Sequence, residues 1–199
     1  MSRDYSHAAL PATIHLLGLK LRPLSLGHVL TMKRHDVAFV SEVECAAGIE
    51  DLLLGVLICS MTWEEWQTFE DSSGFSNEIA RWGRTVRRDL IRNHAKDFNL
   101  LAVFETFKRY VNDSCKVPEM WFTNDSGSTS DTPWFQSVKL TLMGELNHSL
   151  SEAMNCPLQA AILDYCRNAE SHGIIKLISD EEMAAAKANS EPAKAEVTA

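Results

Sequence analysis

Cysteine thiols are the first groups in this chain that could carry chemistry, as nucleophiles or as zinc ligands. The five cysteines are Cys45, Cys59, Cys115, Cys156 and Cys166. They lack C-x-x-C spacing and have no pair of histidines at ligand spacing, so the pattern indicates neither a zinc site nor a redox pair. We expect reduced thiols, with Cys59 and Cys166 as small core residues of apolar helical segments.

Histidines and paired carboxylates are the next candidates, and their spacing also argues against a reaction. His28 and His35 lie seven residues apart on one predicted helix face, but no third ligand stands at metal spacing, so we expect structural or surface roles. Adjacent glutamates such as Glu64 and Glu65 diverge on a helix instead of converging on a substrate. The sequence has no glycine-rich phosphate loop, G-x-S-x-G or H-E-x-x-H motif. We therefore predict a protein that is not an enzyme, with no catalytic residue, metal ligand or cofactor.

Arginines form the strongest charge pattern. The segment 75–93 predicts an amphipathic helix whose polar face carries Arg81, Arg84, Arg88 and Arg92 at spacings of three, four and four. Residues 81–96 hold six basic residues and one acidic residue, in a chain whose formal net charge is -8. This basic face is either a solvated surface, paired internally with acidic helices, or a surface for an acidic protein or phosphate. No aromatic residue interleaves with the arginines, so a stacking platform for single-stranded nucleic acid is absent.

Tryptophans are the candidates for anchoring a protein partner. Trp63, Trp66 and Phe69 recur at spacings of three on a predicted helix, a stripe that is typical of a core or of a docking face. Trp121 lies in the run 119–122, which is either an anchoring contact or an exposed hook. Trp134 begins a helix after Pro133. We hypothesise that Trp63, Trp66, Trp121 and Trp134 line a surface that binds a partner.

Capping signals predict where the helices that carry these residues begin and end. Ser149 with Glu152, and Thr62 with Glu65, have the reciprocal capping-box spacing, and Ser25 and Asp97 can each cap the helix that follows. Pro157 fits the first turn of the following helix, and Gly173 fits a left-handed cap after it. The other elements that we predict are an extended segment over 17–22 and helices over 25–34, 49–60, 62–70, 75–93, 97–112, 133–146 and 179–188.

These elements predict a mainly α protein, a compact multi-helix domain with a short extended N-terminal segment and a flexible tail. With 199 residues, 45% hydrophobic and 23% charged, the chain can bury a core without disulfides. The longest apolar run, Leu52 to Cys59, is far too short to span a bilayer, and no export signal is visible, so we expect a cytoplasmic protein. The expected organisation is a leader 1–13, a helical lobe 14–123, a flexible loop 124–132, a C-terminal helical lobe 133–189 packed on the first, and a disordered tail 190–199.

Three segments resemble small morphogenesis proteins of tailed bacteriophages: Leu19 to His28, Leu52 to Trp66 and Leu146 to Tyr165. The last is similar to tail assembly chaperones, in which a short capped helix leads to a proline-started helix with a small-residue and aromatic face. Ser149, Ala153, Pro157, Ala160, Ala161 and Tyr165 match that pattern.

The resemblance implies a small, acidic, mainly helical, non-enzymatic protein that binds the tape-measure protein, and sometimes the tail tube protein, in the host cytoplasm while the tail is built. It identifies no binding residues. Two alternatives stay open: a regulator that binds nucleic acid or an acidic partner through the arginines, and a structural head-tail connector. The acidic net charge argues against nucleic acid as the main partner, and we expect no membrane association.

Overall fold

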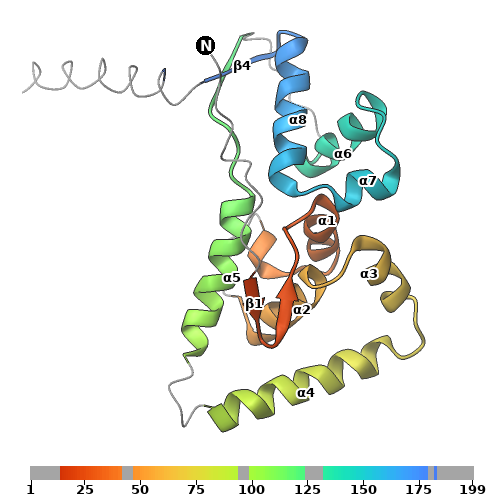
Figure 1. Ribbon diagram of the computed structural model, residues 1–199, viewed down its shortest axis with the longest axis vertical. Helices are drawn as coiled ribbons and strands as arrows, with labels where there is room; N and C mark the ends of the chain where they lie inside the picture. Colours follow the sequence, from red (N-terminus) through yellow and green to blue (C-terminus); the bar gives the residue numbers. More distant parts are fainter. Residues whose placement is uncertain (1–13, 42–46, 94–98, 124–131, 179–181, 183–199) are drawn as a thin grey trace, which may run out of the picture.

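The mainly α class is confirmed by a computed structural model, which describes residues 14–41, 47–93, 99–123, 132–178 and 182 (Figure 1). The predicted leader 1–13, the tail 190–199 and the loop 124–132 apart from Thr132 lie outside the described residues. The same holds for the predicted last helix over 179–188, apart from Glu182.

Eight α-helices, one 3-10 helix and four short strands make up the described part of the chain. In order they are β1 (Ile14–Leu16), β2 (Leu19–Leu21), α1 (Leu26–Arg34), η2 (Ala38–Val40), α2 (Ile49–Cys59), α3 (Trp63–Glu70), α4 (Phe75–Asn93), α5 (Leu100–Ser114), β3 (Met120–Phe122), α6 (Trp134–Gly144), α7 (Leu150–Asn155), α8 (Leu158–Ser171) and β4 (Ile175–Leu177). In Figure 1 α6, α7 and α8 lie at one end of the molecule, α4 lies at the other, and α1, α2 and α3 lie between them.

The predicted caps at Ser25, Thr62 and Ser149 are confirmed, because each side chain accepts a hydrogen bond from the backbone N–H three residues on. Asp97, the predicted cap of the helix over 97–112, lies outside the described residues. The structure caps α5 with Asn99, whose side-chain oxygen accepts from the Ala102 N–H, and the helix begins at Leu100. Both positions carry a suitable side chain, so the sequence pattern alone did not distinguish them.

The predicted extended segment over 17–22 is a strand only over Leu19–Leu21 (β2), which is the second strand of a hairpin that begins at Ile14. β1 and β2 pair antiparallel, with Leu16 opposite Leu19. Leu17 and Gly18 have φ values of 50° and 80° and form the two-residue turn, a left-handed backbone that glycine adopts without strain. Leu17 therefore follows the alternation of the strand in sequence but lies in the turn.

One hydrophobic core joins residues of both predicted lobes. α2 supplies fully buried side chains such as Leu52 and Ile58, and α8 supplies Leu158 and Ile162. Backbone hydrogen bonds also connect the two parts, since the Leu158 N–H donates to the Leu24 carbonyl over 2.7 Å. The segment before α1 is thereby held against the start of α8.

The predicted left-handed cap at Gly173 is confirmed, and the chain turns back after α8. Gly173 has a φ of 69°, and the following strand β4 pairs antiparallel with β3. In this register Trp121 stands opposite Lys176. The run 119–122 is thus anchored through its backbone, while the Trp121 side chain is 57% exposed.

Candidate functional site

A groove of about 510 Å³ lies where α1, α3, α6 and α7 meet, and Trp63, one of the predicted anchors, lines it. Its lining combines apolar and aromatic side chains, uncharged polar groups and three cations, without a carboxylate. The residues are Leu30, Thr31, Lys33, Arg34, Trp63, Gln67, Pro133, Phe135, Gln136, Lys139 and Met154.

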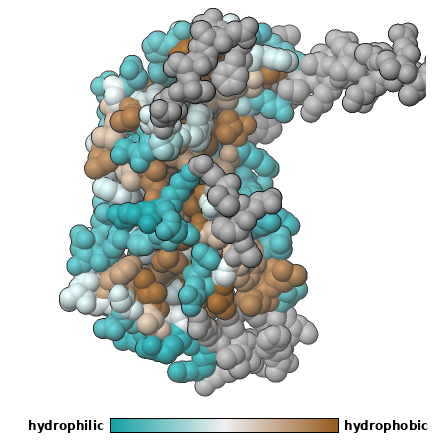
Figure 2. All heavy atoms as spheres, turned by 180° about the vertical axis from the view of Figure 1, so that it is seen from behind, coloured by the Kyte–Doolittle hydropathy of each residue, from teal (hydrophilic) through white to brown (hydrophobic). Residues whose placement is uncertain are grey.

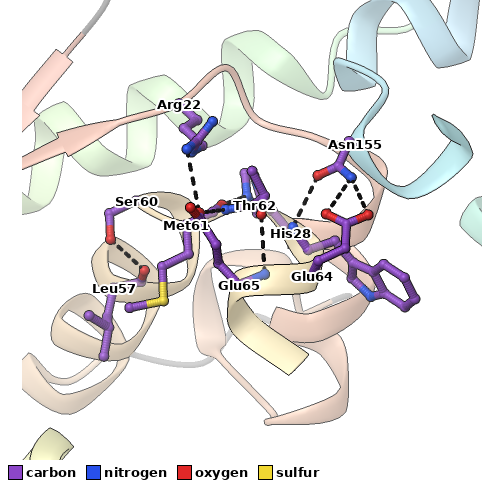
Figure 3. A network of polar contacts seen from close by, with 10 residues as sticks. Arg22, His28, Leu57, Ser60, Met61, Thr62, Glu64, Glu65 and Asn155 are labelled. Carbon is purple, nitrogen blue, oxygen red and sulfur yellow. Dashed lines mark hydrogen bonds and ion pairs between the residues drawn. The ribbon is translucent and has the colours of Figure 1, made fainter. Parts of the chain in front are cut away.

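Hydrogen bonds between Asn155 of α7 and Glu64 form a clamp at the first turn of α3, where Trp63 lies (Figure 3). The backbone N–H of Trp63 donates to the side-chain oxygen of Asn155 over 3.0 Å. The Asn155 amide nitrogen donates to both carboxylate oxygens of Glu64 over 2.8 Å, and the Ser151 hydroxyl donates to the same carboxylate. Hydrogen bonds from Ser151 and Asn155 lower the pKa of Glu64 below its usual range. The clamp thus fixes the start of α3 on α7.

Close packing of α1 against α3 and α7 also positions Trp63. A Cβ atom at Gly27 would lie 2.7 Å from the backbone oxygen of Met154 and 3.1 Å from Cδ1 of Trp63. Only a glycine therefore fits between the three elements as they stand. Neither Gly27 nor Asn155 was predicted as a positioning residue, because the contacts join segments far apart in the sequence.

A buried histidine connects α1 to the turn before α3. The Ser25 N–H donates to His28 Nδ1 over 3.1 Å, so Nε2 carries the proton and donates to the Met61 carbonyl over 2.7 Å. Burial, with a smaller contribution from the charge of Arg22, lowers the pKa of His28 to about 4, despite the opposing effect of the Met61 hydrogen bond. His28 is therefore neutral at pH 7 and holds the α2–α3 turn in place, in agreement with the predicted structural role.

The cations of the groove differ in their surroundings. Lys33 Nζ lies 5.1 Å from the centre of the Phe135 ring, and Arg34 forms an ion pair with Glu70. Lys139 has no ion pair with a carboxylate among the described residues. Aromatic surface and positive charge thus stand side by side.

The four predicted tryptophan anchors do not share one surface. Trp66 is 1% exposed and packs against Phe69 and Phe75, so in the folded chain it belongs to the core and cannot serve as a surface anchor. The reason is helical geometry, since a spacing of three turns a side chain about 60° around the axis. Trp63 can therefore face the groove while Trp66 faces the core. Trp121 lies on the β3–β4 sheet.

Trp134 lies beside the groove but does not line it. Its ring packs edge-on against Tyr165, with 4.8 Å between the ring centres. Its neighbours Pro133 and Phe135 supply the α6 side of the groove instead. The aromatic residue of α6 that lines the groove is therefore Phe135, the residue next to the predicted anchor Trp134. Phe135 was not predicted because the predicted anchors were all tryptophans.

The arginines of α4 lie away from the groove. Arg81, Arg84 and Arg88 are exposed, and the side chain of Arg92 lies outside the described residues. On the other face of α4, Ile79 and Trp82 line a second hollow of about 440 Å³ beside Leu53 of α2, with Arg84 at its border. The helix over 75–93 thus has an apolar face and an opposite face with exposed arginines, as predicted.

Exposed apolar residues are scattered over several elements, and in the view of Figure 2 apolar patches alternate with polar ones. Within the described residues, no three His, Cys, Asp or Glu side chains come together as a metal site. The same residues contain no helix that is long and apolar enough to cross a membrane.

Comparison with known proteins gives no match to a family model, a curated protein or a solved structure.

Proposed function

We propose that this chain is a non-enzymatic assembly chaperone that binds a segment of a partner protein in the Trp63 groove. The observation that carries the proposal is the groove itself, an aromatic and apolar hollow bordered by Lys33, Arg34 and Lys139. Aromatic side chains in concave sites dominate the energetics of protein interfaces, and cations beside them supply specificity.

The groove is preformed in the chain without a partner. The backbone of Trp63 is bonded to Asn155, and Gly27 lies close to its side chain, so the start of α3 need not be reordered on binding. A hollow of this size holds a few side chains, as expected for a short segment of a longer protein. Such a contact is small enough to be exchanged, which an assembly chaperone requires.

The resemblance to phage tail assembly chaperones gives the proposal its specific form. In that form the partner is the tape-measure protein, with the tail tube protein as a further partner, and binding takes place in the host cytoplasm during tail construction. The acidic, helical character of the chain is compatible with this role.

Co-expression with the tape-measure protein from the same source tests the proposal. We expect a complex that co-purifies and keeps the long partner in solution, with a stoichiometry measurable by light scattering. Trp63→Ala should weaken the complex at least ten-fold, whereas Trp121→Ala, which removes an exposed tryptophan from the β3–β4 sheet, should leave it unchanged. Equal binding by both variants and the parent chain would contradict a role for the groove.

A second candidate function rests on the exposed arginines of α4. Arg81, Arg84 and Arg88 could bind an acidic protein or phosphate groups. Binding of phosphate groups through these residues should weaken steeply between low and physiological salt, whereas apolar contacts at Trp63 should change little. The triple Arg→Gln variant at these positions would abolish such binding and leave the groove intact.

A further inference from the structure

We infer that the segment bound in the Trp63 groove is an acidic amphipathic helix, an inference that rests on the proposed function and specifies its partner. The surfaces around the groove are helices α1, α3, α6 and α7. No strand lines it, so an extended peptide would find no sheet edge here on which to pair its backbone. A helix satisfies its own backbone hydrogen bonds and needs only side-chain contacts.

The apolar half of the groove fits one face of such a helix. Trp63, Phe135 and Met154 come from three different elements and enclose the same hollow. Apolar side chains at positions i, i+3 or i+4, and i+7 of an amphipathic helix form a stripe that inserts into grooves of this kind. The volume of about 510 Å³ accommodates the tips of a few such side chains.

The charges of the groove select the polar face of the partner. Three of its eleven lining residues are cations and none is acidic, in a chain with a net charge of -8. The lining of the groove is thus positively charged, although the chain as a whole is negatively charged. Lys139 has no carboxylate partner within the described structure, so a glutamate or aspartate of the bound helix can pair with it without breaking an existing ion pair.

Lys33 and Arg34 add to this effect in different ways. Lys33 lies over Phe135, so its charge is held at the apolar surface, where a nearby carboxylate is less screened by water. Arg34 already pairs with Glu70, so its positive charge is partly neutralised and it attracts a carboxylate of the partner less strongly than an unpaired cation does. A helix with lysines on its polar face would be repelled by these cations.

Two labelled peptides test the inference with the full chain. Both are helical and carry the same leucine stripe, but one has glutamates and the other lysines on the polar face. Fluorescence anisotropy at moderate salt should show the glutamate peptide binding at least ten-fold more tightly. Lys139→Glu should weaken binding of the glutamate peptide by at least about five-fold, because it removes one partly exposed ion pair and adds a like charge. Lys108→Glu makes the same change in net charge on α5, away from the groove, and should have no effect.

The outcomes separate the inference from the proposed function. Equal binding of the two peptides, with both lost in Trp63→Ala, would overturn the acidic partner and leave the groove as a protein-binding site. Failure of both peptides and of the tape-measure protein to bind would remove the proposed function as well. Displacement of the glutamate peptide by a single-stranded oligonucleotide at equal concentration would show that the groove recognises negative charge alone, which also contradicts the inference.

Discussion

Protonation of His28 should destabilise the fold as the pH falls from about 6.5 to about 4. His28 is 3% exposed and is held as the neutral tautomer between the Ser25 N–H and the Met61 carbonyl. Its pKa in the folded chain is about 4, against an ordinary value of 6.5. Since the folded pKa is the lower one, the unfolded chain binds the proton first, and acid favours unfolding.

The size of the effect follows from the pKa difference. Each pKa unit corresponds to about 1.4 kcal/mol, so this single histidine should remove roughly 3 kcal/mol of unfolding free energy across the window. The loss should begin near pH 6.5 and level off below about pH 4. For a domain with a typical stability of about 5–15 kcal/mol, this is a substantial fraction.

Urea unfolding followed by circular dichroism at pH 7, 6, 5 and 4 measures the loss. The control is His28→Gln, which keeps a side-chain acceptor for the Ser25 N–H, as in an ordinary capping box, but cannot be protonated in this range. We expect the stability of the parent chain to fall more steeply than that of the variant between pH 6.5 and 5. Parallel pH profiles would refute the reasoning.

NMR gives a second reading that does not depend on the variant. The ring resonances of His28 in the folded chain should titrate near pH 4, and a midpoint near 6.5 would show that the ring is not held neutral by burial. The carboxylates whose pKa is lowered, such as Glu64, lose their contribution as the pH falls below about 4.5. The window between pH 6.5 and 5 therefore reports the histidine and not these groups.

Three further changes test the packing around the groove, each by urea unfolding. Gly27→Ala should cost about 1–3 kcal/mol, because its Cβ would clash with the Met154 backbone, whereas Gly144→Ala, with open space around it, should be neutral or stabilising by up to about 1 kcal/mol. Asn155→Ala should cost about 1 kcal/mol and weaken binding of the glutamate peptide, since it frees Trp63; unchanged binding would show that the clamp does not position the groove. Gly83→Ala should stabilise by up to about 1 kcal/mol, because the new methyl would meet Leu53 at an ordinary 3.7 Å.

Local signals in the sequence were sufficient to predict the helices. The capping pairs at Thr62 and Ser149 and the glycine at 173 act within a few residues of themselves, so the helix boundaries follow from them. The exceptions are also local in origin. Asp97 and Asn99 are both suitable caps, and Leu17 continues an alternation that ends at a turn, so pattern alone could not choose between the possibilities.

The groove could be predicted only in part, because its geometry depends on contacts between distant segments. Trp63 was predicted as an anchor from its type, but nothing near it in sequence distinguishes it from Trp66. The distinction arises from which side of α3 packs on the core, and that side depends on contacts with distant segments, such as the hydrogen bond from the Trp63 N–H to Asn155. Phe135 and Lys139 join the groove only because α6 packs beside α1.

The first turn of α1 links the stability of the fold to the shape of the groove. Gly27 allows α7 and Trp63 to approach α1, and the next residue, His28, holds the Met61 carbonyl at the turn that leads into α3. A proton on Nδ1 of His28 would remove the acceptor for the Ser25 N–H and place a charge in the buried interior, where His28 is only 3% exposed. Because the pKa of His28 in the folded chain is about 4, the folded protein takes up this proton only near pH 4. We therefore expect affinity for the groove to hold between pH 6.5 and 5, and to decrease near pH 4 more in the parent chain than in His28→Gln.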